Sequence, residues 1–492
     1  MTRFSQPTFL NGPPQPLVLT MDTWGEAPLD LYRKIASPSQ PSFLLESGRS
    51  LARKPSYSFL GSDPVGILVS DLPAGQKQSG DAFTKLRAIV SDSGIEKTAQ
   101  LPPFYGGAVG YFSYDCVRRF ESLPSIALND LSIPDFQFAL FDLIAAIDHR
   151  TSRIQIIFCP SMERFLGETR DKLYREGLDR IAACEARLKQ RTHAKRTDSL
   201  HDQISFTAQQ TREAYLDRVR RCKQYIAAGD IYQANLSHRF TIGIPPWARN
   251  GSNRLRYEQA LYETLCALNP SPFSGLLHFD DLSLVSCSPE RLVRRQGRQV
   301  DTRPIAGTRP RGLSEANDRQ LVGELLANEK ERAEHLMLVD LERNDLGRVC
   351  EFGSVHVDEF MAVEQYSHVS HIVSNIRGTL RQNATALDVI KATFPGGTIT
   401  GVPKIRCMEI IEELEPVRRG PYTGSFGYIG WNGDLDLNII IRTLILQGKK
   451  GYLQVGAGIV ADSDPAKEYE ETLHKAQAFF SSLQRTPPCG ST

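Results

Sequence analysis

The nine cysteines of this 492-residue chain form no paired motif. Their number is odd, they are scattered along the sequence, and none stands in a C-x-x-C spacing. This pattern indicates neither a disulfide framework nor a zinc site. It is typical of reduced thiols in a cytoplasmic protein.

The chain also lacks an excess of one charge and a long apolar run. Its 58 basic and 57 acidic residues leave a formal net charge of +1, so we expect no general attraction to nucleic acid or to an anionic membrane. Residues 1–17 contain no apolar signal core, and no uncharged run approaches the length that spans a bilayer. These absences predict a protein of the cytoplasm that acts on neither nucleic acid nor membrane.

A chain of 492 residues is too long for one ordinary core, so we expect two domains. Residues 1–200 contain short β-rich runs punctuated by Gly, Pro and Ser, and they end in a basic linker at 189–198. Residues 205–485 alternate strands with helices. Strands that pair with sequence neighbours, together with long outer helices, favour an α+β layered fold over a doubly wound nucleotide fold.

Local signals place several elements of the second part. Thr211 is expected to cap a helix that Gly229 ends, and Asp464 with Pro465 to begin the last helix. The apolar run "LNIIIRTLIL", at 437–446, is predicted to be one buried strand. Arg442 lies inside it, and a buried cation needs an anionic partner from the protein or from a ligand.

Two predicted helices each carry a pair of glutamates three positions apart, on one helix face. The pairs are Glu331 with Glu334 in residues 328–348, and Glu468 with Glu471 in residues 464–476. Paired carboxylates with almost no histidine suit a hard, oxygen-liking ion such as Mg²⁺. The alternative is that both helices simply present charged faces to solvent.

Three glycine-rich stretches are candidates for ligand binding. "RPIAGTRPRG", at 303–312, is either a solvated turn or a loop that holds an anion. "FPGGTITGVPK" lacks the Gly-Lys-Ser/Thr of a phosphate loop, but it can present Thr398 to a ligand. Gly456 and Gly458 can expose backbone amides to a carboxylate or mark a β-bulge. With the acidic helices, these features predict a Mg²⁺-dependent enzyme acting on a small polyanionic carboxylate.

The order of the motifs is more specific than any one of them. "SCSPERL", "DTRPIAGTRPRG", "EHLMLVDLERNDLGRVC", "FPGGTITGVPKIRCMEIIEELEP", "IIIRT" and "GAGIVADSDPAKEYEET" follow one another as they do in chorismate-utilising enzymes. From about residue 205 to 483 the chain resembles the large subunits of anthranilate synthase and aminodeoxychorismate synthase. "FLLESG" and "YSFLGSDP" resemble their N-terminal domain. The resemblance implies two packed antiparallel β-sheets with helices on the outside.

The resemblance also implies roles for individual residues. The implied Mg²⁺ ligands are Glu334 and Glu471, supported by Glu331 and Glu468. The residues implied to bind chorismate are Gly307, Thr308, Tyr422, Arg442, Gly456, Ala457 and Gly458. Those implied to act at the reacting ring are His371, Thr398 and Glu290, the last as a general acid or base.

Within the family, two sets of residues point to different products. Ala306 stands where aminodeoxychorismate synthases typically carry a nucleophilic lysine, and with "YSHVSHIVSNI" it favours anthranilate synthase. "GDIYQANLSHRF", "NPSPFSGLL", "GGTITG" and "YTGSFGY" resemble aminodeoxychorismate synthase instead. Four segments outweigh one position, so we expect aminodeoxychorismate synthase component I. Anthranilate synthase component I is the alternative, and isochorismate or salicylate synthase a more distant one.

The family also suggests a regulatory pocket and a partner. Ser47, Pro272, Phe273 and Ser274 match positions that form the tryptophan pocket of anthranilate synthases. No cysteine-histidine-glutamate amidotransferase segment is recognisable, so ammonia from glutamine is expected to come from a separate subunit. A non-catalytic binding protein would need neither the paired acidic helices nor Arg442.

Overall fold

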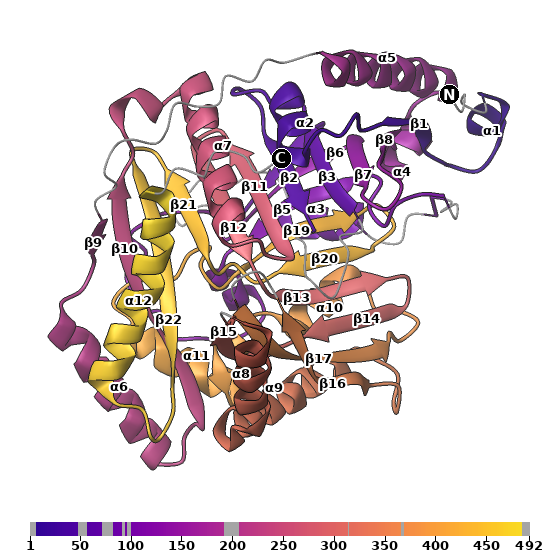
Figure 1. Cartoon of the computed structure of the whole chain (residues 1–492). Helices are drawn as coiled ribbons and strands as arrows, with labels where there is room; N and C mark the ends of the chain where they lie inside the picture. Colours follow the sequence, from indigo (N-terminus) through magenta and orange to yellow (C-terminus); the bar gives the residue numbers. More distant parts are fainter. Residues whose placement is uncertain are drawn as a thin grey trace.

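The computed structural model describes residues 6–47, 57–70, 82–90, 94–95, 100–190, 206–312, 314–365 and 369–484. Two large β-sheets form its centre, and helices lie on the outside (Figure 1). This confirms the α+β class and the layered arrangement expected from the sequence. Within the described residues, no helix is both long enough and apolar enough to cross a membrane.

In the described part of the chain, the first sheet has 12 strands, and its neighbouring strands run antiparallel. Their order is β1 (Leu17–Asp22), β8 (Arg153–Phe158), β7 (Leu143–Asp148), β3 (Tyr57–Ser62), β2 (Ser42–Glu46), β11 (Phe273–Phe279), β12 (Leu282–Ser288), β21 (Thr443–Gln447), β22 (Lys450–Ile459), β10 (Gln233–Gly243) and β18 (Gly401–Val402), with β9 (Phe206–Ala208) paired to β10.

The second sheet has 10 strands among the described residues, and these also run antiparallel. Their order is β15 (Ile305–Pro310), β17 (Val369–Thr379), β14 (Gln299–Arg303), β13 (Arg291–Gln296), β20 (Leu435–Asn438), β19 (Ser425–Gly430), β5 (Gly107–Phe112), β6 (Phe136–Phe141) and β4 (Gly66–Val69), with β16 (His356–Gln365) paired to β17.

The helices flank the sheets (Figure 1). They are α1 (Gln6–Asn11), α2 (Pro28–Ile35), α3 (Ala82–Ile89), α4 (Met162–Gly167), α5 (Arg170–Lys189), α6 (Arg212–Ala227), α7 (Gly251–Leu268), α8 (Glu315–Ala327), α9 (Glu329–Gly347), α10 (Ala386–Thr393), α11 (Lys404–Leu414) and α12 (Pro465–Gln484), with short 3₁₀ turns η1 (Tyr114–Arg119), η2 (Pro246–Ala248) and η3 (Gly397–Ile399).

The local signals for helix ends are confirmed. The Thr211 side chain accepts a hydrogen bond from the backbone amide of Ala214 at the start of α6. Gly229, just beyond that helix, has a φ of +83°, which glycine adopts without strain. At the start of α12, the backbone amide of Lys467 donates to Asp464 Oδ1 at 3.0 Å. Capping depends on a few adjacent residues, so the sequence alone could place these ends.

The prediction of one strand at 437–446 is wrong. β20 ends at Asn438 in the second sheet, and β21 begins at Thr443 in the first. The four residues between them carry the chain from one sheet to the other. Arg442 ends this crossing with a φ of +49° and is exposed rather than buried in a strand. A crossing between two packed sheets is as apolar as a buried strand, so hydrophobicity could not tell them apart.

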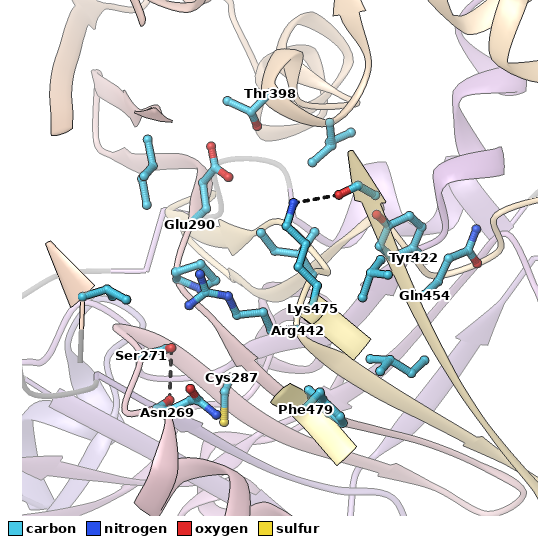
Figure 2. Close-up of a pocket in the computed structure, with 18 of the residues that line it drawn as sticks. Asn269, Ser271, Cys287, Glu290, Thr398, Tyr422, Arg442, Gln454, Lys475 and Phe479 are labelled. Atoms are coloured by element: carbon cyan, nitrogen blue, oxygen red, sulfur yellow. Dashed lines mark hydrogen bonds between the residues drawn. The ribbon is translucent and has the colours of Figure 1, made fainter. Parts of the chain in front are cut away.

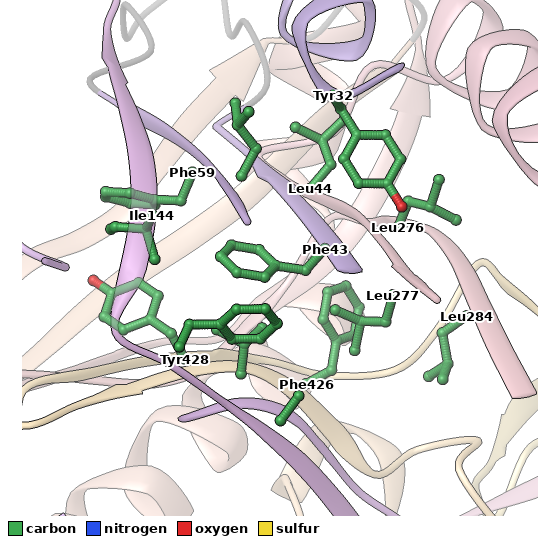
Figure 3. Close-up of a cluster of buried hydrophobic side chains, with 14 of the residues drawn as sticks. Tyr32, Phe43, Leu44, Phe59, Ile144, Leu276, Leu277, Leu284, Phe426 and Tyr428 are labelled. Atoms are coloured by element: carbon green, nitrogen blue, oxygen red, sulfur yellow. The ribbon is translucent and has the colours of Figure 1, made fainter. Parts of the chain in front are cut away.

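The main hydrophobic core is built from both parts of the sequence. Figure 3 shows Phe43 and Phe59 from the first part packed with Phe426 and Tyr428 from the second. β2 pairs with β11, and β5 pairs with β19, so both sheets also contain strands from both parts. The division into 1–200 and 205–485 stays a prediction, and its two parts would share this core. The predicted linker lies outside the described residues from residue 191 onward.

Candidate active site

A cavity of about 480 Å³ is lined by six of the residues predicted to bind chorismate or act on it. They are Glu290, His371, Thr398, Tyr422, Arg442 and Gly456. The lining comes from both sheets, from η3 and from α12, and Figure 2 shows Glu290, Tyr422 and Arg442 around the same space. Residues far apart in the chain therefore meet at one site, with a volume suited to a small organic ligand.

One side of the cavity can hold a carboxylate. Arg442 lies in the lining with Tyr422 and Gly456. A Cβ atom at Gly456 would lie 2.1 Å from Asn235 Oδ1 and 2.8 Å from the Tyr422 hydroxyl, so only glycine permits this close approach. A guanidinium can bind a carboxylate through two parallel hydrogen bonds, and a phenol hydroxyl in the same cavity can donate another.

Glu290 follows the end of β12 and is 5% exposed. Burial raises the pKa of its carboxyl from 4.5 to about 7, although the Thr398 hydroxyl, the Ile305 amide and Arg442 each lower it. Its Oε1 atom is buried and has no hydrogen-bond partner among the described residues. A carboxyl that titrates near neutral pH beside an open space is suited to general acid–base catalysis.

His371 and Thr398 complete this side of the cavity. Burial, with a smaller contribution from Arg442, lowers the pKa of His371 to about 4, so its ring is neutral at physiological pH. Its Nδ1 atom lies 3.4 Å from the carbonyl oxygen of Gly307. Thr398 Oγ1 is buried without a partner in hydrogen-bond geometry, although it is near enough to favour the charged form of Glu290. Both side chains can therefore offer neutral polar groups to a ligand.

The four predicted metal-binding glutamates lie on α9 and α12, and the other three are within electrostatic range of Glu334. Burial raises the pKa of Glu334, and the carboxylates of Glu331, Glu468 and Glu471 raise it further. Glu331 Oε2 is buried and lacks a hydrogen-bond partner among the residues that the structure describes, while its Oε1 accepts from Arg309 at 2.7 Å. Mutually repelling carboxylates and an unsatisfied oxygen fit a divalent cation.

The carboxylates do not yet form a closed coordination shell. Among the residues that the structure describes, no three His, Cys, Asp or Glu side chains are grouped closely enough to hold an ion.

The comparison with known families rests on nearly the whole chain. The model of the chorismate binding enzymes matches residues 40–481. This chain belongs to the chorismate-binding enzyme family. It is therefore a chorismate-utilising enzyme, as the motif order indicated.

Relatives with two different activities are equally similar. Aminodeoxychorismate synthase component 1 of Bacillus subtilis is 42% identical over 469 residues, which cover 93% of this chain and 94% of that protein. Anthranilate synthase component 1 of Thermus thermophilus is 42% identical over 468 residues, covering 93% and 96%. Overall identity therefore does not select the product.

Solved structures agree with the family assignment. Anthranilate synthase component I from Streptococcus pneumoniae aligns with a TM-score of 0.76 at 33% identity, covering 86% of this chain and 92% of that one. The menaquinone-specific isochorismate synthase of Escherichia coli aligns with a TM-score of 0.68 at 18% identity, covering 96% of each chain. The latter match shows a common fold.

Other predicted residues of this chorismate-binding enzyme lie near the cavity without lining it. Gly307 has a φ of +71°, and a Cβ there would lie 2.8 Å from Glu331 Oε2. Thr308 is in β15 opposite His371, and its side chain lies outside the described residues. Ala457 is buried in a hydrophobic cluster, and Gly458 faces Gln233. Gly307 and Gly458 have no side chain, so their predicted contacts with chorismate would be made by backbone groups.

The sequence reasoning missed two polar residues of this enzyme's cavity, Gln454 and Lys475. Asn235, from a segment expected to shape the ring pocket, also lines it, and its buried Oδ1 has no hydrogen-bond partner among the described residues. Two signals could have found Gln454 and Lys475. Gln454 is two residues from Gly456 and therefore on the same face of β22. Lys475 follows Glu471 by one turn of α12.

A second cavity of about 310 Å³ brings together the residues of the predicted tryptophan pocket. Ser47, Pro272, Phe273 and Ser274 all line it. Glu46 is also in the lining, and burial raises its pKa to about 7 although it accepts a hydrogen bond from Tyr262. Aromatic rings beside ionisable groups suit an amino acid with an aromatic side chain.

Proposed function

We propose that this enzyme is aminodeoxychorismate synthase component I. It would convert chorismate and ammonia to 4-amino-4-deoxychorismate for the synthesis of 4-aminobenzoate and folate. A separate glutamine amidotransferase subunit would supply the ammonia, in keeping with relatives that are named as component 1. The observation that supports chorismate chemistry is the grouping of Glu290, Thr398, Tyr422 and Arg442 around one cavity.

The protein's own residues would bind and orient the substrate. Arg442 and Tyr422 would bind the enolpyruvyl carboxylate, at the position where Gly456 allows close approach. His371 and Thr398 would contact the ring, because both line the same cavity. Mg²⁺ held by Glu334 and Glu471 would bind the ring carboxylate and act as a Lewis acid toward the departing group.

Glu290 is the group proposed to move a proton. With a pKa of about 7, it is present in both protonation states at neutral pH. In its acid form it would protonate the leaving oxygen of chorismate. Ala306 has no amine, so no covalent lysine adduct could form at this position. Ammonia would form the C4–N bond directly as the C4–O bond breaks, and the protonated hydroxyl would leave as water.

The choice of branch rests on the ring-pocket segments. Asn235 and Pro272 line the active-site cavity, and they belong to two of the segments that resemble aminodeoxychorismate synthase. Ala306 favours the second candidate, anthranilate synthase component I, which would release anthranilate and pyruvate.

Product analysis separates the two candidates. The purified chain would be supplied with chorismate, Mg²⁺ and ammonium chloride, and the products separated by chromatography. We expect 4-amino-4-deoxychorismate as the main product. Anthranilate and pyruvate in equal amounts would overturn the proposal in favour of anthranilate synthase. Loss of chorismate without Mg²⁺ would contradict the proposed metal requirement.

A further inference from the structure

Two lysines flank the four carboxylates of α9 and α12, each one helical turn from a glutamate. Lys475 Nζ lies 2.7 Å from Glu471 Oε1, and Lys330 Nζ lies 4.0 Å from Glu334 Oε1. The two lysines differ in one respect. Lys475 lines the active-site cavity, whereas Lys330 is absent from its described lining.

Lys475 also contacts the strand on which the substrate carboxylate is proposed to lie. Its Nζ donates a hydrogen bond to the carbonyl oxygen of Gly456 at 2.8 Å (Figure 2). Gly456 borders the Tyr422 hydroxyl, and both residues line the same cavity as Arg442. One ammonium group therefore bridges a proposed metal ligand, Glu471, and the proposed carboxylate site.

We propose that Lys475 couples metal binding to substrate binding by exchanging its partner Glu471 for the substrate carboxylate. The inference rests on the proposed chorismate and Mg²⁺ sites and adds a residue to them. Lys475 is a positioning residue in this scheme, because it moves no proton and forms no covalent bond.

The physical basis is competition between two cations for one carboxylate. An ammonium 2.7 Å from Glu471 Oε1 opposes the approach of a divalent cation to the same side chain. When the divalent cation binds, it weakens the attraction between Glu471 and Lys475. The lysine side chain is long and 49% exposed, so its ammonium is able to turn toward an anion in the cavity.

This exchange makes the two binding events cooperative. The cation releases Lys475 for the substrate, and the substrate draws Lys475 away from the cation's ligand. Thermodynamic linkage requires the effect to be equal in both directions. Lys330 has the corresponding charge on α9 but does not line the described cavity. We therefore expect Lys330 to repel the cation without coupling cation binding to substrate binding.

The test measures binding rather than turnover. Mn²⁺ would replace Mg²⁺, and its affinity would be measured by electron paramagnetic resonance of the free ion, with and without chorismate and without ammonia. The variants are Lys475→Gln, Lys475→Arg and the matched control Lys330→Gln. We expect each Gln variant to bind Mn²⁺ alone more tightly, by roughly three- to tenfold, because one competing positive charge is removed.

The coupling distinguishes the two lysines. In the wild type and in Lys330→Gln, chorismate should strengthen Mn²⁺ binding by about tenfold, within the usual range for coupled sites. In Lys475→Gln this gain should fall to about twofold or less, and Lys475→Arg should restore most of it because the positive charge remains. Equal coupling in Lys475→Gln and Lys330→Gln would overturn the inference, as would wild-type protein without coupling.

Failure of the proposed function would look different. If the product with ammonium is anthranilate while the coupling depends on Lys475, the assignment as aminodeoxychorismate synthase is wrong and the role of Lys475 stands. If the expected product forms while Lys475→Gln keeps the full coupling, the proposed function stands and the inference about Lys475 is overturned.

Discussion

Glu290 and Arg291 are neighbours in the chain, but they line different cavities. Glu290 lies in the lining of the active-site cavity. Arg291 lines the second cavity, where its Nε donates to Asp436 at 2.8 Å. Pro272 lines both cavities, so the two spaces adjoin at this residue.

The first prediction concerns the pH dependence that Glu290 causes. As a general acid with a pKa of about 7, it should give a rate that falls as the pH rises through about 7. Glu290→Gln should lower kcat by about 10²–10⁴-fold and remove this limb from the pH profile. Steady-state kinetics between pH 5.5 and 9 would check this. If the rate of the variant fell through the same pH range as that of the wild type, another group would be responsible for the pH dependence.

The same residue predicts a change in stability. The folded pKa of Glu290 is raised above 4.5, so between pH 4.5 and about 7 the folded protein keeps a proton that the unfolded chain has lost. The free energy of unfolding therefore falls as the pH rises through this window. Glu290→Gln removes the charged form and should be more stable than wild type at pH 8, by about 2 kcal/mol. Urea unfolding should show the difference shrinking at pH 5.

The second prediction concerns the acidic helices. Glu334→Gln and Glu471→Gln should each reduce Mg²⁺-dependent turnover by more than about 10²-fold, because each removes a negative oxygen ligand without changing side-chain volume. The matched control is Glu185→Gln, which removes a similar i,i+4 partner of Lys189 on α5. Thermal unfolding should show all three variants folded. Near-normal activity of Glu334→Gln or Glu471→Gln at limiting Mg²⁺ would show that the substituted glutamate is not a metal ligand.

The third prediction concerns Arg442. Arg442→Lys should raise the KM for chorismate by about tenfold or more, because an ammonium cannot reproduce the two parallel hydrogen bonds of a guanidinium to a carboxylate. Arg442 lies at the crossing between the sheets and is exposed to the cavity, so the fold should be retained. A KM equal to that of the wild type would show that Arg442 binds a protein group instead.

The fourth prediction tests the close approach at Gly456. Gly456→Ala places a Cβ 2.1 Å from Asn235 Oδ1 and 2.8 Å from the Tyr422 hydroxyl, so these groups must shift and chorismate binding should weaken by about tenfold or more. Gly243→Ala, at the other end of the β10–β22 ladder, meets no atom within 4 Å and serves as the control. Equal chorismate affinities in the two variants would show that the space around Gly456 is not needed for binding.

Much of the fold could be derived from short stretches of sequence. Thr211, Gly229 and Asp464 mark helix ends through contacts with residues a few positions away. The i,i+3 spacing likewise put Glu331 with Glu334 on one helix face. The motif order identified the family because such stretches are read directly from the chain, and the match over residues 40–481 confirmed it.

Only the tertiary structure decided where these stretches meet. It brought α9 and α12 together although more than a hundred residues separate them, and it placed Arg442 at a crossing between sheets instead of within a strand. It also buried Glu290 enough to raise its pKa to about 7. Helix periodicity and capping are set by neighbours in the sequence. The burial of a side chain, the electrostatic field at a carboxyl and the partner of Lys475 are set by strands and helices that are distant in the sequence. A local sequence pattern does not contain this information.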